Sequence, residues 1–128
     1  MSHSHKDLIV WQRARALAGE IYRTTETFPK HEIYGLTSQL RRAAVSVASN
    51  IAEGQGRLTK GEFQHFLGQS RGSLLELETQ LGIALDLSYL SLDRIEILES
   101  KTTEVRRLLN GLIDSLRGKS KNLSGIST

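Results

Sequence analysis

Glu62 and His65 have the residue types and the spacing that could hold a metal ion. A Glu-x-x-His pair places a carboxylate and an imidazole on one face of a helix, as in carboxylate-bridged di-iron bundles. Such a centre also needs a second Glu-x-x-His pair and a glutamate from each remaining helix, and the chain has no second pair. Thr59 and Glu62 instead match a capping box at a helix start. The sequence therefore predicts no metal site.

Other motifs give little support for an enzyme. Gly54 and Gly56 could bend backbone amides towards a phosphate, but no strand is expected before them and no Gly-Lys-Ser/Thr follows. No nucleophile elbow singles out a set of Ser, His and Asp residues. We expect His31 in a loop and His65 on a helix surface, where neither is a convincing general base. We therefore predict no catalytic residue, no cofactor and no enzymatic activity.

Cationic side chains are the candidates for contact with phosphate. Arg41 and Arg42 are adjacent, so they project about 100° apart on a helix and can serve different partners. Each could pair with an acid across a bundle, such as Glu76 or Glu78, or contact a phosphate. The full set of candidate nucleic-acid contacts is Arg41, Arg42, Arg57, Lys60, Arg117, Lys119 and Lys121.

The net charge of +3 is concentrated at the C-terminus. From Arg117 onward the chain has three cations and no acid, whereas residues 1–116 carry 14 cations and 14 acids. Such a tail on a neutral body could touch phosphate, or it could be a solubilising end. Both interpretations stay open.

Length and composition indicate one globular domain. The chain has 128 residues, of which 38% are hydrophobic and 24% charged, with a single proline and no cysteine. The lack of cysteine excludes disulfides, thiolate metal sites and cysteine nucleophiles. No run approaches the roughly 18 apolar residues of a membrane span, and the N-terminus does not resemble a signal peptide. We therefore expect a cytoplasmic protein without a membrane partner.

Four amphipathic segments are expected to position these residues. The first helix, of about 20 residues, follows a cap at Asp7 and stops before Pro29. The second begins between Glu32 and Thr37 and stops at Gly54–Gly56, the third runs from Thr59 to about Leu87, and the fourth from Ser91 to Arg117–Gly118. Short connections favour antiparallel neighbours. We predict an all-α, up-down-up-down four-helix bundle over 7–117, with a disordered N-terminus (1–6) and a flexible basic tail (118–128).

The second helix carries two stripes at helical spacing. Its apolar stripe is expected to face the core. A polar stripe beside it is expected to face either another helix, which its small side chains would let approach closely, or solvent. In the third helix Gly68 and Gly72 lie one turn apart, which favours a close crossing within the chain or between subunits. The candidate packing or oligomer contacts are Ser46, Ser49, Asn50, Glu53, Gly68 and Gly72.

Several runs resemble a known family. These are LIVWQ at 8–12, YGLTSQLRRAA at 34–44, SNIAEG at 49–54 and GSLLELETQL at 72–81, in that order along the chain. Together they resemble the bacterial four helix bundle protein family, named for proteins encoded in intervening sequences of large-subunit ribosomal RNA genes. The matching runs span about residues 7 to 90. The fourth helix is predicted from its apolar pattern alone.

The resemblance implies a bundle assembled as a ring-like homopentamer, in a family without an established activity. It also implies kinship with the accessory variability determinant of diversity-generating retroelements, a similar pentamer that binds nucleic acid and its reverse transcriptase. That relative is strongly basic, whereas the body of this chain is neutral. Five tails of +3 on one face of a pentamer would restore a strong positive charge.

Two functions follow as hypotheses. The first is a non-enzymatic oligomer that binds nucleic acid, RNA or DNA but foremost structured RNA, through phosphate contacts. An aromatic content of 5% disfavours base stacking as the main mode. The alternative is a protein-interaction scaffold whose partner packs on the polar stripe of the second helix or on the ring surface.

Overall fold

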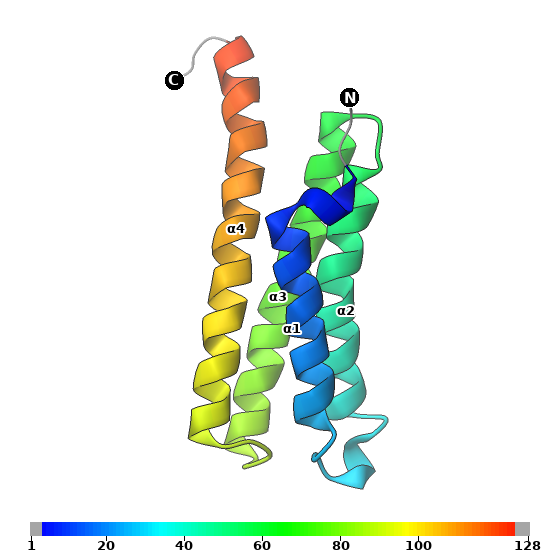
Figure 1. Ribbon diagram of the computed structural model, residues 1–128, viewed down its shortest axis with the longest axis vertical. Coiled ribbons are helices and arrows are strands. Elements are labelled where there is room, and N and C mark those ends of the chain that lie inside the picture. The colour runs from blue at the N-terminus through cyan, green and yellow to red at the C-terminus, as the bar shows by residue number, and fades with distance from the viewer. Residues whose placement is uncertain (1–3, 125–128) are drawn as a thin grey trace.

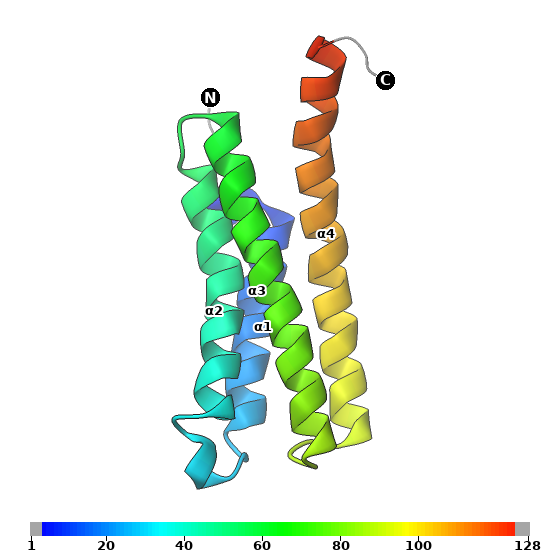
Figure 2. The ribbon, with the colours of Figure 1, turned by 180° about the vertical axis from the view of Figure 1, so that it is seen from behind.

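Four long helices form an up-down-up-down bundle (Figures 1 and 2). The computed structural model describes residues 4–124, except for the side chains of Asp7 and of 119–124. Within them, no strand occurs. The helices are α1 (Ile9–Thr25), α2 (Leu36–Gln55), α3 (Lys60–Asp86) and α4 (Leu92–Ser124), with 3-10 turns at His5–Asp7 and Lys30–Glu32. The prediction of an all-α four-helix bundle is confirmed. No helix in the described range combines the length and apolar character needed to cross a membrane.

The N-terminal segment is more ordered than predicted. The hydroxyl of Ser4 accepts a hydrogen bond from the backbone N–H of Lys6, and the ring of His5 packs edge-on against Trp11, with centroids 4.8 Å apart. The prediction that residues 1–6 are disordered is therefore wrong for residues 4–6, and residues 1–3 lie outside the described chain. Because α1 begins after Leu8, Asp7 belongs to the preceding turn rather than to the N-cap position.

The start of α2 is defined by a carboxylate. Glu32 Oε1 accepts a 2.9 Å hydrogen bond from the backbone N–H of Leu36, one of the donors that a helix start leaves without an intrahelical partner. The observed start at Leu36 lies within the predicted range. Gly35 precedes it, and a Cβ there would lie 2.5 Å from Glu32 Oε1. The capping carboxylate thus explains the glycine.

Caps also define α3. Thr59 Oγ1 accepts from the N–H of Glu62 at 3.1 Å, as predicted. At the other end the N–H groups of Ser88 and Tyr89 donate to the carbonyls of Leu85 and Ala84, each at 2.9 Å, which is a Schellman motif. The left-handed position of this motif is usually glycine, but here Ser88 occupies it with φ 63°.

The predicted end of α4 is wrong. Ser91 Oγ caps its start by accepting from the N–H of Arg94 at 3.1 Å, but the helix continues through Gly118 to Ser124. A glycine inside a helix costs only about 1 kcal/mol relative to alanine, and it ends a helix when the backbone turns left-handed there. The boundary predicted between bundle and tail therefore falls inside a helix, which extends beyond the other helices (Figure 1).

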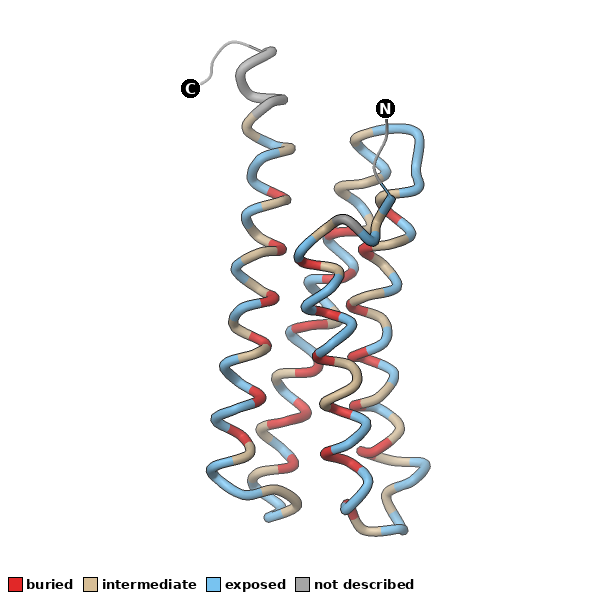
Figure 3. Tube along the Cα trace, in the orientation of Figure 1, coloured by how far each residue is buried: buried red, intermediate tan, exposed pale blue. Residues whose placement is uncertain are grey.

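Buried positions recur along the sides of the helices that face one another (Figure 3). Most were expected from apolar spacing, and each buried leucine contributes about 1.5–3 kcal/mol relative to an exposed one. In the C-terminal part of α4 the apolar spacing predicts Leu112 and Leu116 as buried, but Ile113 is buried and these two leucines are half-buried. Fully buried leucines, isoleucines and valines include Leu17, Ile21, Leu40, Val47, Ile51, Leu74, Leu77, Leu81, Leu98, Val105 and Leu109.

Candidate functional site

The candidate phosphate contacts fall into two groups along the bundle. Arg57 and Lys60 flank the α2–α3 connection, which lies at the same end as the chain termini and the last turns of α4 (Figures 1 and 2). The sequence places Arg117, Lys119 and Lys121 in those last turns, although the side chains of the two lysines lie outside the described residues. Arg41 and Arg42 belong to the opposite half of α2.

The two halves of the molecule carry opposite net charge. Residues 4–13, 47–75 and 104–124, which make up the half with the termini, hold ten Lys and Arg against five Asp and Glu, a net charge of +5. We call this half the basic end. Residues 14–46 and 76–103 hold seven Lys and Arg against nine Asp and Glu, a net charge of −2. The neutral body expected from the sequence is therefore polarised along the bundle axis.

Arg57 is held in place by two neighbours. Its Nη2 lies 3.0 Å from Glu53 Oε2, one turn earlier on α2, and its guanidinium carbon lies 4.6 Å from the centre of the Phe66 ring. Glu53, a candidate oligomer contact, is thus paired within its own chain. Both side chains are exposed, so their attraction is weak and a phosphate can compete for Arg57. Phe66 pre-positions the guanidinium for such a contact.

Arg41 is a packing residue. Its Nε donates a 2.8 Å hydrogen bond to Thr25 Oγ1, and Nη2 reaches the carbonyl of Tyr22 at 3.4 Å. Its guanidinium also lies over the Tyr22 ring, 4.7 Å from the centroid. Arg41 thus binds the end of α1 rather than the predicted acid. Sequence reasoning missed Thr25 as a partner because a hydroxyl leaves no charge pattern.

Arg42 lines a small hollow between α2 and α3. The hollow has a volume of about 310 Å³ and is also lined by Glu76 and Gln80. Gln80 is only 6% exposed, and its Oε1 has no hydrogen-bond partner among the described residues. Among the described residues, neither Arg42 nor Glu76 forms an ion pair within 4 Å. Glu78, the other predicted acid, pairs with Arg106. The predicted pairing of Arg42 with Glu76 is therefore not formed.

One residue of the polar stripe on α2, Ser46, contacts α3 of the same chain, and Asn50 of α2 supports it. Ser46 Oγ shares a 2.8 Å hydrogen bond with Ser73 Oγ, and Asn50 Nδ2 donates to both the carbonyl and the hydroxyl of Ser46 at 2.9 Å. Ser70 adds a buried bond to the carbonyl of Val47 at 2.8 Å, which the sequence did not predict. Ser49 remains exposed.

Gly68 and Gly72 do not mark a crossing within the chain. A Cβ added at either position would meet nothing within 4 Å, so that part of the prediction is wrong. The close approach occurs at Gly54, where an added Cβ would lie 2.9 Å from both Phe63 Cδ1 and Phe66 Cβ. Gly54 was interpreted as a helix stop, and its packing role leaves no local sequence signal.

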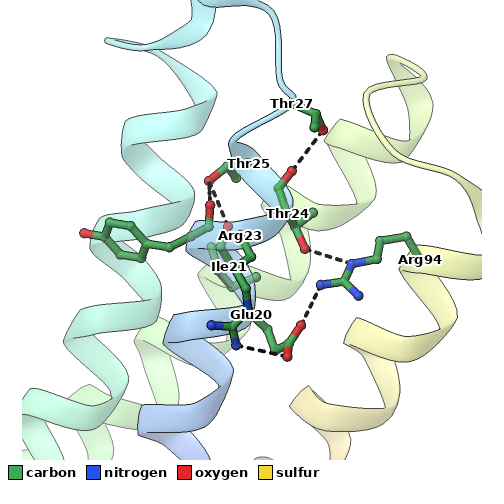
Figure 4. A network of polar contacts seen from close by, with 8 residues as sticks. Glu20, Ile21, Arg23, Thr24, Thr25, Thr27 and Arg94 are labelled. Atoms are coloured by element: carbon green, nitrogen blue, oxygen red, sulfur yellow. Dashed lines mark hydrogen bonds and ion pairs between the residues drawn. The ribbon is translucent and has the colours of Figure 1, made fainter.

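A polar network joins the end of α1 to the start of α4 (Figure 4). Arg94 at the start of α4 donates to Thr24 Oγ1 at 2.9 Å and to Glu20 Oε1 at 2.6 Å, both near the end of α1. Arg23 binds the other oxygen of Glu20 at 3.1 Å. Hydrogen bonds first from Arg94 and then from Arg23 lower the pKa of Glu20 below its usual value. This network fixes α4 against α1.

The described residues contain no group of three or more His, Asp or Glu side chains arranged to hold a metal ion. The ring of His65 lies 3.1 Å from the side-chain nitrogen of Gln69 on the surface of α3.

Residues 6–111 match the family described as 23S rRNA-intervening sequence protein. The chain belongs to this family. The family agrees with the one suggested by the runs of residues between 7 and 90, and the match extends along α4 to residue 111. The last turns of α4, with Arg117, Lys119 and Lys121, lie beyond the range that matches.

The fold of this family member also occurs in a solved structure. A protein of unknown function from the S23 ribosomal protein family of Bacteroides thetaiotaomicron VPI-5482 is similar with a TM-score of 0.74 and 20% sequence identity. The similarity covers 82% of this chain and 98% of the other, and at this identity it supports the fold alone. No curated protein is similar to the chain at a significant level.

Proposed function

We propose that this protein is a non-enzymatic bundle that binds nucleic acid, foremost structured RNA, through phosphate contacts at its basic end. The main support for this proposal is the uneven distribution of charge: one half of the molecule has a net charge of +5 and the other half has −2. Arg57, Lys60 and the cations of the last turns of α4 share that end. The family's name refers to intervening sequences of 23S ribosomal RNA genes and does not itself favour RNA over DNA, so both nucleic acids are ligands to test.

The proposed contacts position the protein without reading bases. Exposed Arg and Lys side chains bind phosphate oxygens, which carry no sequence information directly. Arg41 is left out of the proposed contacts, because its guanidinium is held by Thr25, the carbonyl of Tyr22 and the Tyr22 ring. Arg42 lies outside the basic end and faces Glu76 across the hollow, so it is a secondary candidate.

Assembly as a homopentamer in the cytoplasm completes this proposal. The family resemblance implies a ring, and a ring with parallel subunits would place five basic ends on one face. The outer face of α3 supports such a contact, since its glycines at 61, 68, 72 and 82 all have open space where a Cβ would lie. Ser49 and Glu53 on α2 remain candidates for the same interface.

The test is fluorescence anisotropy with a structured RNA and a duplex DNA at low and physiological salt. The double variant Lys119→Gln, Lys121→Gln keeps the length of α4 and removes two cations. A separate variant, Arg57→Gln, removes one cation beside the α2–α3 connection. Each lost phosphate contact is expected to weaken binding to all sequences alike and to reduce the salt slope by about one. Lys30→Gln and Lys101→Gln in the other half are matched controls and are expected to bind like the wild type.

The alternative function is a protein-interaction scaffold. The glycine-rich outer face of α3 favours it, because a partner helix could approach that backbone closely. Absence of nucleic-acid binding at both salt concentrations would reject the first proposal. A partner whose binding responds to changes at Ser49 or Gly72, and survives loss of the C-terminal cations, would support the scaffold.

A further inference from the structure

The end of the bundle opposite the termini, which we call the distal end, exposes large apolar side chains. It consists of the α1–α2 connection, the α3–α4 connection and the first turn of α4 (Figure 1). Tyr34 is 95% exposed, and Ile33, Leu87 and Leu92 are also exposed. Tyrosine is enriched at the energetic centres of protein interfaces, because it brings a large apolar area with few rotatable bonds.

The loop that carries Tyr34 is held from several directions. Glu32 accepts hydrogen bonds from the N–H of Leu36 at 2.9 Å and from the hydroxyl of Tyr89 at 2.8 Å. The Tyr89 ring packs against Phe28, with centroids 5.4 Å apart. Within the loop, the N–H of Gly35 donates to the carbonyl of Glu32 at 2.9 Å. Tyr34 is therefore presented on a pre-organised turn, which lowers the entropy lost when a partner binds.

A hollow adjoins this turn. It has a volume of about 290 Å³, and its lining includes the apolar side chains of Phe28, Pro29 and Ile33. Polar and charged side chains, Lys30 among them, line the rest of the hollow, and Ile33 directly precedes Tyr34 in the chain. A single apolar side chain from a partner fits such a volume.

The charge around the distal end determines the kind of partner. Residues 20–35 and 86–96 hold six Asp and Glu against three Lys and Arg. Arg23 and Arg94 both bind Glu20, which leaves Lys30 as the cation of these segments without an ion pair in the described chain. Four acids of these two segments have no ion pair with another described residue: Glu26, Asp86, Asp93 and Glu96.

We propose that the distal end docks a basic segment of another protein, with Tyr34 as its central contact. An apolar side chain of the partner enters the hollow beside Ile33, and its Lys or Arg residues pair with the exposed acids and lie over the Tyr34 ring. The negative charge disfavours RNA at this end. The proposed RNA contacts are at the other end, so one molecule can hold both partners at once.

The experiment uses the full chain labelled with ¹⁵N and a short amphipathic peptide of leucine and lysine as the probe. Chemical-shift changes are expected to concentrate at 26–35 and 86–96. Tyr34→Ala is expected to weaken binding about tenfold or more, as for a central interface residue. Leu58→Ala is the matched control, because Leu58 is 98% exposed in the α2–α3 connection at the basic end. It is expected to leave the affinity unchanged.

Further probes and variants separate the contributions. The same peptide with glutamate in place of lysine, or serine in place of leucine, is expected not to bind. Glu26→Gln with Glu96→Gln is expected to weaken binding and to reduce its salt dependence. Equal affinity of the wild type and Tyr34→Ala, or shift changes concentrated elsewhere, overturns the proposal.

Two other outcomes also overturn it. A change in oligomeric state on Tyr34→Ala, measured by light scattering, would assign this surface to a second copy of the chain. A loss of RNA affinity in the same variant would assign it to nucleic acid. Because the Lys119→Gln, Lys121→Gln variant tests the basic end separately, failure of either proposal leaves the other intact.

Discussion

The hydroxyl of Tyr89 donates a 2.8 Å hydrogen bond to Oε2 of Glu32, which joins the α3–α4 connection to the α1–α2 connection. The other oxygen of Glu32 caps α2 through the N–H of Leu36. One carboxylate thus links a helix start to a loop 57 residues away in sequence. These bonds hold the turn that presents Tyr34.

The first prediction concerns the pH dependence of this link. The hydrogen bond from the Leu36 N–H, and then that from Tyr89, lower the pKa of Glu32 below its usual value of 4.5. A carboxyl whose pKa is lower in the folded state stabilises the fold above its unfolded pKa, and this contribution is lost as the pH falls through the folded pKa. Glu32→Gln is therefore expected to lower the melting temperature at pH 7, with a difference that shrinks below about pH 4.5.

Melting temperatures measured by circular dichroism between pH 3 and pH 7 test this expectation. Glu26→Gln is the control, since Glu26 is exposed and has no ion pair in the described chain. It is expected to show no comparable difference. A stability difference between Glu32→Gln and the wild type that stays constant over the whole range would contradict the assignment to ionised Glu32.

The second prediction concerns Ser88, which adopts φ 63° in the Schellman motif after α3. A left-handed conformation costs a non-glycine residue roughly 1–2 kcal/mol, whereas glycine adopts it freely but loses more entropy on folding. Ser88→Gly is therefore expected to raise the free energy of unfolding by about 0.5–1 kcal/mol. Ser88→Val, with a branched Cβ, should lower it. Urea denaturation measures both, and a destabilised Ser88→Gly variant would refute the argument.

The features that could be predicted from the sequence are those that depend on residues close together in the chain, namely the helices and their caps. Apolar spacing identified the four helices, and the caps at Thr59 and Ser91 placed two of their starts. It failed for contacts between distant segments, such as the link between Glu32 and Tyr89 or the bond from Arg41 to Thr25. Residues that meet across a bundle leave no spacing signal in a single chain.

The charge distribution shows the same limit. Counting along the chain gave a neutral body and a basic tail, because cations and acids balance over residues 1–116. Antiparallel folding then brings the cations of three separate segments to one end. The stop predicted at Gly118 failed for a different reason, since a glycine tolerates a helix as well as a turn and the choice depends on its surroundings.

The third prediction concerns the glycines of α3. A Cβ at Gly68, Gly72 or Gly82 would meet nothing within 4 Å, so replacement by alanine removes unfolded-state entropy without a clash. Each Ala variant is expected to gain about 0.4–1 kcal/mol in the free energy of unfolding of the monomer. Gly54→Ala is the contrasting variant and is expected to be destabilised, because its Cβ would lie 2.9 Å from Phe63 and Phe66.

Denaturation together with light scattering separates two explanations for these glycines. A gain in stability with an unchanged oligomeric state would show that no second copy of the chain packs on this face. A loss of monomer stability at Gly68→Ala or Gly72→Ala would contradict the third prediction. A gain in monomer stability together with a lower oligomeric state would agree with it and would support the proposed subunit contact at α3.

The fourth prediction separates the two adjacent arginines of α2. Arg41 binds Thr25 and Tyr22 and lies over the Tyr22 ring, whereas Arg42 is exposed and has no hydrogen bond in the described chain. Arg41→Gln is expected to lower the free energy of unfolding by about 1–2 kcal/mol, the usual cost of losing such bonds, and Arg42→Gln to change it by less than about 0.5 kcal/mol.

Neither variant is expected to reduce the affinity for RNA as much as Arg57→Gln does, because both arginines lie outside the basic end. Urea denaturation and anisotropy on the same three variants check both parts of the prediction. If Arg42→Gln weakened RNA binding as strongly as Arg57→Gln while leaving stability unchanged, the RNA would have to extend along α2 past the basic end. The proposed interface would then include the hollow that Arg42 and Glu76 line.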